Sequence, residues 1–157
     1  MERTGLRRAD FEELGRSGEA DGVKRIYIVG NEIVYLTFPL ADDIMCIFGG
    51  GFAVSNLASA AWMGEKDLYY FGDEDEHGFE ILALFRSSFP SVKSFLMDTK
   101  TYLDHISYAV RGRKAASAYD SLLTPEEMET LTMLRENPEK SRLEQERISI
   151  AYIKSRL

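Results

Sequence analysis

Four short apolar runs recur along the chain, and each one stops at a glycine or at an acidic residue. The runs are nearly continuous rather than alternating strictly with polar positions. This pattern is typical of strands that are buried on both faces of a parallel sheet. The predicted strands cover residues 26–29, 44–48, 68–71 and 92–97.

Segments in which apolar residues recur at helical spacing lie between and after these runs. Strands that alternate with helices predict right-handed βαβ crossovers, and therefore a doubly wound α/β sheet of about four parallel strands flanked by helices. The predicted helices cover residues 32–38, 52–62, 79–86 and 101–110.

Two further helices are predicted near the C-terminal end from their capping sequences. Thr-Pro-Glu-Glu at 124–127 combines a capping box with proline at the first helical position, and it predicts a helix over 125–136. Asn-Pro at 137–138 breaks that helix. Ser-Arg-Leu-Glu at 141–144 has the spacing of a second capping box and predicts a helix over 142–155.

The N-terminal stretch differs in character from the rest of the chain. Residues 1–22 are polar and show little apolar periodicity, so we interpret them as a linker or the remnant of a preceding segment. Residues 23–157 then form one domain, which is large enough to bury a core. No apolar stretch approaches the ~18 residues that a membrane span needs. The single cysteine, Cys46, lies in an apolar run, which fits a reducing cytoplasm and excludes a disulfide framework.

The charge constrains how the protein can bind nucleic acid. The formal net charge is −7 at pH 7, whereas a protein that binds DNA alone usually presents a basic face. The basic residues are scattered, apart from the short cluster of Arg111, Arg113 and Lys114. If the substrate is nucleic acid, another domain or a partner is expected to supply most of the binding.

The acidic run at 73–76 is the strongest candidate for chemistry. Adjacent carboxylates repel by about 1 kcal/mol per close pair even in water, and solubility does not require that density. The run follows a predicted strand, and open α/β sheets bind ligands outside the carboxyl ends of their strands. Asp73 and Asp75 are spaced i, i+2 and would present two carboxylates to one side, which suits Mg²⁺. The alternative is that Asp75 or Glu76 caps the following helix.

Other polar residues near the strand ends are weaker candidates for a functional role. His77 could donate to a phosphate or relay a proton, or could lie on the first helical turn without a special role. Asp98 could support the site from the next strand or cap the turn that follows it. Glu144 is explained by the second capping box and Glu146 faces several arginines, so both are interpreted as structural. The glycines at 49–51 are interpreted as a tight turn, because no Gly-Lys-Ser/Thr follows them.

Several short motifs, taken together in their order along the chain, resemble one family. The most distinctive is Tyr-Phe-Gly-Asp-Glu-Asp-Glu-His-Gly-Phe at 70–79. Over residues 24–157 the chain resembles a Toprim domain, specifically the C-terminal domain of JetD, the nuclease subunit of the bacterial, condensin-like Wadjet system that restricts plasmids. The other motifs are Asn-Glu-Ile at 31–33, Phe-Pro at 38–39, Phe-Gly-Gly-Gly-Phe at 48–52, Phe-Leu-Met-Asp at 95–98 and Arg-Leu-Glu-Gln-Glu-Arg-Ile at 142–148.

This resemblance implies a Toprim fold and a metal-dependent DNA endonuclease. It implies that Asp73 and Asp75 hold Mg²⁺ or Mn²⁺, which would neutralise a phosphodiester and stabilise the oxygens of the displacement. The implied partners are double-stranded plasmid DNA, the SMC subunits of a condensin-like complex and a second copy of the protein in a homodimer. The family also has a winged-helix-like portion, before this region, that would hold part of the DNA.

One position departs from the family pattern. The family usually has Glu-Asn-Glu where this chain has Gly30, Asn31 and Glu32, and the first glutamate is the expected metal ligand or general acid/base. Loss of a positioned acid/base typically costs about 10²–10⁴ in rate. Either Glu32 compensates from two residues further on, or the domain is catalytically impaired and serves dimerisation or docking onto SMC-like partners.

A receiver-like phosphoryl-transfer domain is the third hypothesis, because such folds also gather acids at strand ends. It would need a lysine at the end of a later strand and paired acids after the first strand. Lys93 precedes the end of its predicted strand, and Asp42 and Asp43 precede the second strand. The sequence therefore disfavours this class.

Overall fold

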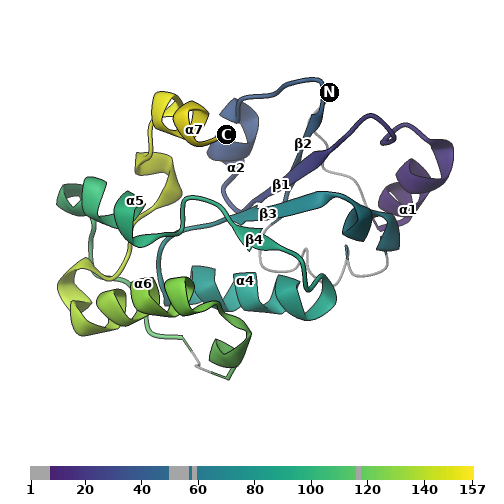
Figure 1. Ribbon diagram of the computed structural model, residues 1–157. Coiled ribbons are helices and arrows are strands. Elements are labelled where there is room, and N and C mark those ends of the chain that lie inside the picture. Colours follow the sequence, from purple (N-terminus) through teal and green to yellow (C-terminus); the bar gives the residue numbers. More distant parts are fainter. Residues whose placement is uncertain (1–7, 50–56, 58–59, 116–117) are drawn as a thin grey trace.

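The computed structural model describes residues 8–49, 57, 60–115 and 118–157. Helices and strands alternate through the first two thirds of this chain, and helices follow at the C-terminal end (Figure 1). Short 3₁₀ segments lie at 61–65, 106–108, 120–122, 138–140 and 145–147. The main elements are α1 (Arg8–Ser17), β1 (Arg25–Val29), α2 (Glu32–Thr37), β2 (Ile44–Phe48), β3 (Asp67–Phe71), α4 (Glu76–Ser88), β4 (Lys93–Ser94), α5 (Thr99–Asp104), α6 (Pro125–Glu136) and α7 (Ile150–Arg156).

The four strands form one parallel sheet in the order β2-β1-β3-β4. Val29 at the end of β1 lies opposite both Phe48 of β2 and Phe71 of β3, so three strands end at the same level. In Figure 1, α4 and α6 lie below the sheet, and α2 and α7 lie above it. The predicted α/β class, with parallel strands flanked by helices, is confirmed.

The sheet is buried because aromatic residues pack against both of its faces. On one face the ring of Tyr27 stacks on that of Tyr69, with centroids 4.8 Å apart, and Phe95 packs edge-on against Tyr27 at 5.0 Å. On the other face Tyr70 packs against Phe85 of α4 at 5.4 Å. Adjacent positions of β3 thus supply both layers of the core, as the period of a strand requires.

The fourth strand is shorter than predicted. The apolar run over 92–97 contains only Lys93 and Ser94 as strand residues, because Leu96 adopts a φ of 54° and turns the chain out of the sheet. Phe95, Leu96 and Met97 are nevertheless buried. Burial alone therefore produced the apolar pattern that resembled a longer strand.

The predicted helices are confirmed in part. Helix α2 begins after Asn31, whose side chain accepts a hydrogen bond from the amide of Val34 at 3.0 Å, and α4 extends the prediction for 79–86 at both ends. Only the first part of 101–110 is α-helical. The prediction for 52–62 falls mostly outside the described residues.

The two C-terminal predictions have opposite outcomes. Helix α6 covers the predicted 125–136 with its capping box in place. The helix predicted over 142–155 is wrong, since α7 begins only after the cap at Ser149. Ser141 caps no helix there: its hydroxyl accepts a hydrogen bond from the Gly112 amide and donates one to the carbonyl of Pro138.

The N-terminal stretch contributes to the fold. It contains α1, and Ala20 lies in the core at 3% exposed beside Val23 at 1%. The packing of Ala20 differs from that expected of a polar linker, while the domain boundary at residue 22 stays a prediction. Among the helices that the structure describes, none combines the length and apolar character needed to cross a membrane.

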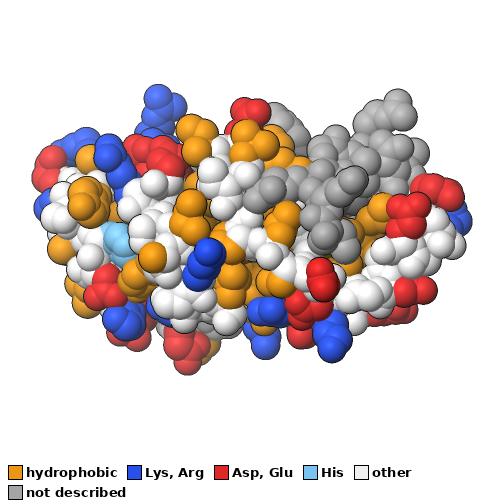
Figure 2. All heavy atoms as spheres, turned by 90° about the horizontal axis from the view of Figure 1, so that it is seen from above, with side chains coloured by type: hydrophobic (Ala, Val, Ile, Leu, Met, Phe, Trp, Pro, Cys, Tyr) orange, Lys and Arg blue, Asp and Glu red, His pale blue; other side chains and the backbone are white. Residues whose placement is uncertain are grey.

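The outer face above the sheet carries charges of both signs. Viewed from above, acidic and basic side chains are interspersed with hydrophobic ones among the described residues (Figure 2). No continuous basic patch covers the coloured part of this face. The expectation that another domain or a partner would supply most of the DNA binding stays a prediction.

Candidate metal centre

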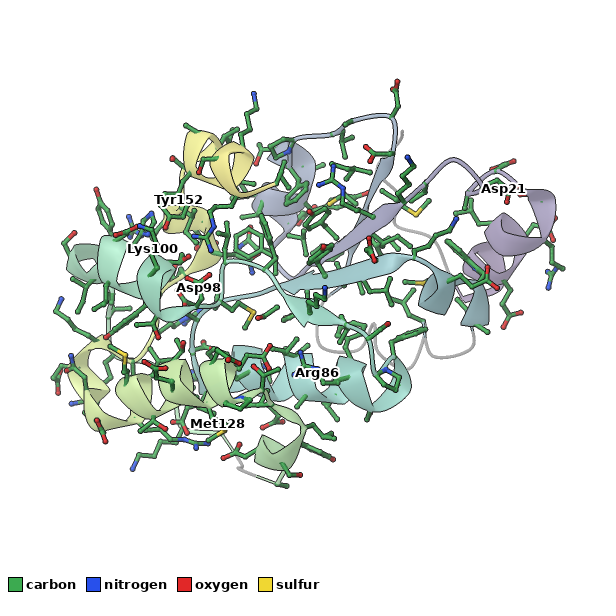
Figure 3. The ribbon with its side chains drawn as sticks, in the orientation of Figure 1. Asp21, Arg86, Asp98, Lys100, Met128 and Tyr152 are labelled. Carbon is green, nitrogen blue, oxygen red and sulfur yellow. The ribbon has the colours of Figure 1, made fainter. Side chains whose placement is uncertain are left out.

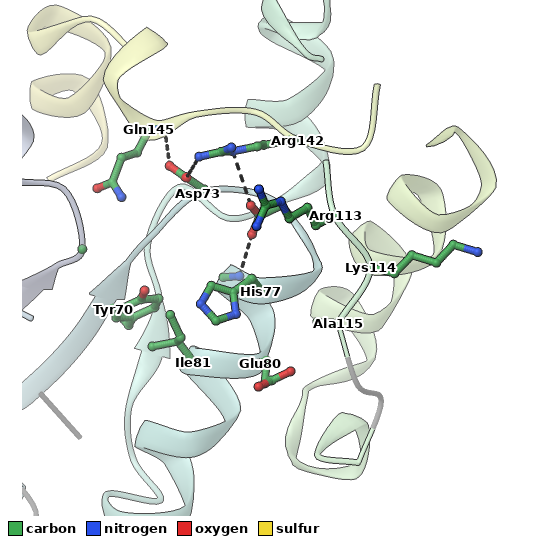
Figure 4. Close-up of a pocket in the computed structure, with 13 residues that line it drawn as sticks. Tyr70, Asp73, His77, Glu80, Ile81, Arg113, Lys114, Ala115, Arg142 and Gln145 are labelled. Carbon is green, nitrogen blue, oxygen red and sulfur yellow. Dashed lines mark hydrogen bonds and ion pairs between the residues drawn. The ribbon is translucent and has the colours of Figure 1, made fainter. Parts of the chain in front are cut away.

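A pocket opens where β1 and β3 end side by side. The chain leaves β1 for β2 on one side of the sheet and leaves β3 for β4 on the other, so this is the switch point at which α/β sheets bind ligands. The cavity has a volume of about 700 Å³ (Figure 4). Its walls come from the strand ends at Gly30 and Asp73, the first turns of α4, the segment 113–115 and the C-terminal residues Arg142 and Gln145.

Asp73 presents both carboxylate oxygens to the C-terminal segment. Its Oδ1 accepts a hydrogen bond from the backbone amide of Gln145 at 2.8 Å. Its Oδ2 accepts one from Nη2 of Arg142 at 3.2 Å. The side chain therefore lies at the pocket wall and is held there by two donors (Figure 4).

Asp75 serves two purposes with its two oxygens. Oδ1 accepts a 2.6 Å hydrogen bond from the amide of Gly78 and so caps α4, which confirms the capping interpretation for this residue. Oδ2 faces Arg142 instead, 3.6 Å from its Nε. Capping thus leaves one oxygen of Asp75 directed toward the neighbourhood of Asp73.

The electrostatics of this pair depend on Arg142. Burial raises the pKa of Asp75, and the charge of Asp73 raises it further, while the Gly78 amide and Arg142 act in the opposite direction. For Arg142, burial lowers the pKa, but Asp73 and Asp75 together hold it above its ordinary value. The guanidinium is thus a fixed positive charge beside two crowded carboxylates.

The start of α4 approaches Asp73 so closely that only glycine fits at position 78. A Cβ on Gly78 would lie 2.0 Å from the backbone oxygen of Asp73. The missing side chain lets the first turn of α4 fold directly against the strand end. Gly78 thereby fixes the geometry of the acidic loop without contributing a functional group.

The amino-acid sequence also matches the model of a known family. The family described as "Wadjet protein JetD, C-terminal" matches residues 10–157. The chain belongs to the JetD C-terminal family. It is therefore a protein of a Wadjet defence system. A comparison with curated proteins returned no match.

The JetD resemblance places an acid at position 30, where this chain has glycine. A Cβ built on Gly30 would point at the pocket wall, 3.2 Å from the Tyr70 hydroxyl and 3.4 Å from Nε2 of Gln145. Glu32, the residue expected to compensate, is exposed on the first turn of α2 and does not line the pocket. The backbone explains this, because α2 starts at Glu32 and turns it away from the end of β1.

The two supporting candidates are placed differently. His77 lines the pocket on the first turn of α4 and is exposed. Asp98 lies at the start of α5, on the side toward α7 (Figure 3), and does not line the pocket. It caps α5 through the amide of Thr101 and pairs with Arg156 at 2.7 Å. The capping alternative therefore holds for Asp98.

Sequence reasoning missed the C-terminal residues around the pocket. Glu144 precedes the 3₁₀ segment 145–147 but its side chain forms no cap hydrogen bond, which corrects its interpretation. Nδ2 of Asn31 donates a hydrogen bond to Oε2 of Glu146. A hydrogen bond shared with Glu144, burial, and the charges of Glu144 and Asp73 raise the pKa of Glu146 to about 7. The only signal for this segment was the family motif at 142–148, since its spacing suggested an ordinary helix.

Glu74 points away from its two neighbours in the acidic run. It is 1% exposed, and neither carboxylate oxygen has a hydrogen-bond partner among the described residues. Burial, followed by the charge of Asp98, raises its pKa well above the ordinary value, while Arg156 lowers it in part. The run therefore divides into two acids that line the pocket, Asp73 and Asp75, one buried acid, Glu74, and Glu76, which pairs with Arg135 at 3.1 Å.

The donor set suits a hard divalent ion. Asp73 and Asp75 offer carboxylate oxygens, and Oε1 of Gln145, which lines the same pocket, is buried without a hydrogen-bond partner in the described chain. No three His, Cys, Asp or Glu side chains converge on one point within the described residues. Mg²⁺ needs only one or two protein carboxylates and completes its shell with waters and substrate phosphates, so the residues fit that ion.

Proposed function

We propose that this JetD C-terminal domain is a Toprim nuclease that cleaves phosphodiester bonds of plasmid DNA with Mg²⁺ or Mn²⁺. The observation that supports it most is the convergence of Asp73 and Asp75 on one cationic group in the switch-point pocket. Two carboxylates that share one positive charge form the kind of environment that a divalent cation also prefers. Membership in a Wadjet family supplies the DNA context.

In this proposal Asp73 and Asp75 hold the ion, which would neutralise the scissile phosphate and stabilise the oxygens of the displacement. The amide of Gln145 fixes the orientation of Asp73. Arg113 and Lys114 line the same pocket and would attract the DNA backbone. His77, exposed at the same pocket, is the available proton donor.

The remaining partners are those that the resemblance to the JetD family implies. With a net charge of −7, the domain would depend on a condensin-like SMC complex to deliver double-stranded plasmid DNA. A homodimer would place two such pockets on the two strands of a duplex. Both partners are part of the proposal.

Plasmid cleavage in Mn²⁺ tests this function. The protein, supplied with its condensin-like subunits, should linearise supercoiled plasmid, and Asp73→Asn should slow cleavage by about 100-fold or more. Asp42→Asn removes the same charge from an exposed loop position and should retain the wild-type rate. Equal rates for wild type and Asp73→Asn would contradict the site.

A second candidate function is favoured by Gly30. Gly30 contributes no carboxylate to the pocket, and Glu32 is not among the described residues that line the pocket. We therefore propose, as the alternative, that the domain is an impaired Toprim module that serves dimerisation or docking onto SMC-like partners. The two candidates differ in what an acid at position 30 would do.

Gly30→Glu separates the two candidates. A Cβ at position 30 would lie 3.2 Å from the Tyr70 hydroxyl and 3.4 Å from Nε2 of Gln145, so these two buried side chains have to shift by a few tenths of an ångström to admit it. An impaired module should gain about 10²–10⁴ in cleavage rate with assembly unchanged. Gly64→Glu, at a position with no atoms within 4 Å of the built Cβ, is the matched control. If wild type already cleaves as fast as Gly30→Glu, the impaired-module alternative fails.

A further inference from the structure

Arg142 occupies the place where a cation would neutralise both pocket carboxylates. Its guanidinium lies 3.2 Å from Oδ2 of Asp73 through Nη2 and 3.6 Å from Oδ2 of Asp75 through Nε. In Figure 4 the Arg142 side chain lies above the pocket, with its guanidinium directed toward Asp73. One positive charge thus faces two negative ones.

The backbone of Arg142 is held by hydrogen bonds, whereas its side chain is partly exposed. Its amide and carbonyl both pair with Val110, at 2.9 Å each, and the next residue, Leu143, pairs in the same way with Glu74. The side chain is 42% exposed. Its Nε is buried but donates no hydrogen bond to any described residue. The guanidinium therefore extends from a backbone segment that is held in place, and its Nε lacks a hydrogen-bond acceptor among the described residues.

We propose that Arg142 holds the metal position in the metal-free protein and is displaced by the ion, moving onto the substrate phosphate. This proposal rests on the proposed function, because it takes Asp73 and Asp75 as the metal ligands. It assigns Arg142 two successive partners, first the carboxylates and then the phosphate. Arg142 is thus a competitor of the metal before it is a ligand of the substrate.

Charge and geometry both drive this exchange. A divalent ion bound to both carboxylates supplies more positive charge than the guanidinium and repels it at close range. The planar guanidinium presents five N–H donors, and a phosphate can accept two of them in parallel. Arg113 and Lys114, which form no ion pair with any described residue, line the same pocket and would draw the phosphate to this side.

Metal affinity measured without DNA tests the exchange independently of turnover. Mn²⁺ is titrated into the full chain by calorimetry, for wild type, Arg142→Gln and Arg111→Gln. Arg142→Gln should bind Mn²⁺ about three- to tenfold more tightly than wild type, because the ion no longer has to displace an ion pair. Arg111→Gln removes the same charge from an exposed residue that pairs with Glu139, outside this pocket, and should change the affinity by less than about twofold.

A second measurement tests whether the Arg142 side chain binds the phosphate once the ion has displaced it. In saturating Mn²⁺, Arg142→Gln should bind a thymidine dinucleotide about tenfold more weakly than wild type, whereas Arg142→Lys should lie between them because it keeps the charge without the planar fork. Thermal unfolding checks that each variant is folded.

The outcomes separate this inference from the proposed function. If wild type binds Mn²⁺ and Arg142→Gln binds it equally or more weakly, the displacement is wrong while the metal site stands. If neither protein binds Mn²⁺, both the site and the displacement are wrong. Binding by Arg142→Gln alone would support the displacement in its strongest form.

Discussion

The backbone amide of Gln145 donates a 2.8 Å hydrogen bond to Oδ1 of Asp73, although the two residues are 72 positions apart. The adjacent bridge between Glu74 and Leu143 joins the same two segments through both backbone groups. The acidic loop and the C-terminal segment are therefore one structural unit. The candidate site is complete only when the last part of the chain has folded onto the sheet.

Gly78→Ala should destabilise the fold, although alanine normally favours a helix by about 1 kcal/mol. The added Cβ would lie 2.0 Å from the backbone oxygen of Asp73, so the loop or α4 has to move. We expect a loss of about 2 kcal/mol in the free energy of unfolding, measured by urea denaturation. Gly64→Ala should change it by less than about 0.5 kcal/mol, because its Cβ meets no atom within 4 Å. Equal stability of the two variants would contradict the close approach.

Glu127→Gln should remove a buried link between α4 and α6. Arg86, labelled in Figure 3, donates Nη1 to Oε1 of Glu127 at 2.5 Å and Nη2 to Oε2 at 3.0 Å, and both side chains are at most 12% exposed. The variant leaves the Arg86 charge without its counter-ion. The free energy of unfolding at pH 7 should fall by about 3 kcal/mol.

A matched control variant and the pH dependence of stability both test the ion pair between Arg86 and Glu127. Glu126→Gln, exposed on the same helical turn, should change stability by less than about 0.5 kcal/mol. Burial raises the pKa of Glu127, but the hydrogen bonds from Arg86 and the Thr124 amide outweigh it, so the pKa is lowered overall. The contribution of the pair should therefore be present above the ordinary value of 4.5 and disappear as the pH falls through the lowered pKa. A pair that keeps its full contribution at pH 2 would contradict this assignment.

Glu74→Gln should change how stability depends on pH. Burial raises the pKa of Glu74 well above 4.5, so the folded protein holds its proton more tightly than the unfolded chain does. The tighter proton binding stabilises the folded state below pH 4.5, and this stabilisation is lost as the pH rises through the raised pKa of Glu74. In a metal-free buffer at pH 8, the glutamine variant should be more stable than wild type by about 1–3 kcal/mol, and at pH 4 the two should be nearly equal. Melting temperatures across pH 4–8 measure this, with the exposed Glu65→Gln as control; parallel curves for Glu74→Gln and wild type would contradict it.

Local patterns were sufficient to predict the sheet and its acidic edge. Strands β1, β2 and β3 are short, apolar and stopped by glycine, so each could be recognised without its neighbours. Asp73 and Asp75 follow β3 directly, and parallel strands bring their carboxyl ends together whatever the rest of the chain does. The capping box at Thr124 is equally local, and it was confirmed.

The sequence could not predict which residues from distant parts of the chain would meet at the pocket. Arg142 reaches the pocket through a bridge to Val110, while the spacing of Ser141 and Glu144 suggested an independent helix. Glu32 lies outside the pocket because α2 begins at that residue. For Arg142 the decisive hydrogen bonds join segments that the sequence cannot show to be adjacent, whereas the placement of Glu32 follows from the local cap at Asn31.

A crystal structure with Mn²⁺ tests the central claim, that Asp73 and Asp75 hold a divalent ion, most directly. We predict an anomalous scattering peak about 2.0–2.2 Å from an oxygen of Asp73 or Asp75, with the Arg142 guanidinium turned away from both. At saturating Mn²⁺, a map without a peak at these carboxylates and with Arg142 still bridging them would contradict it.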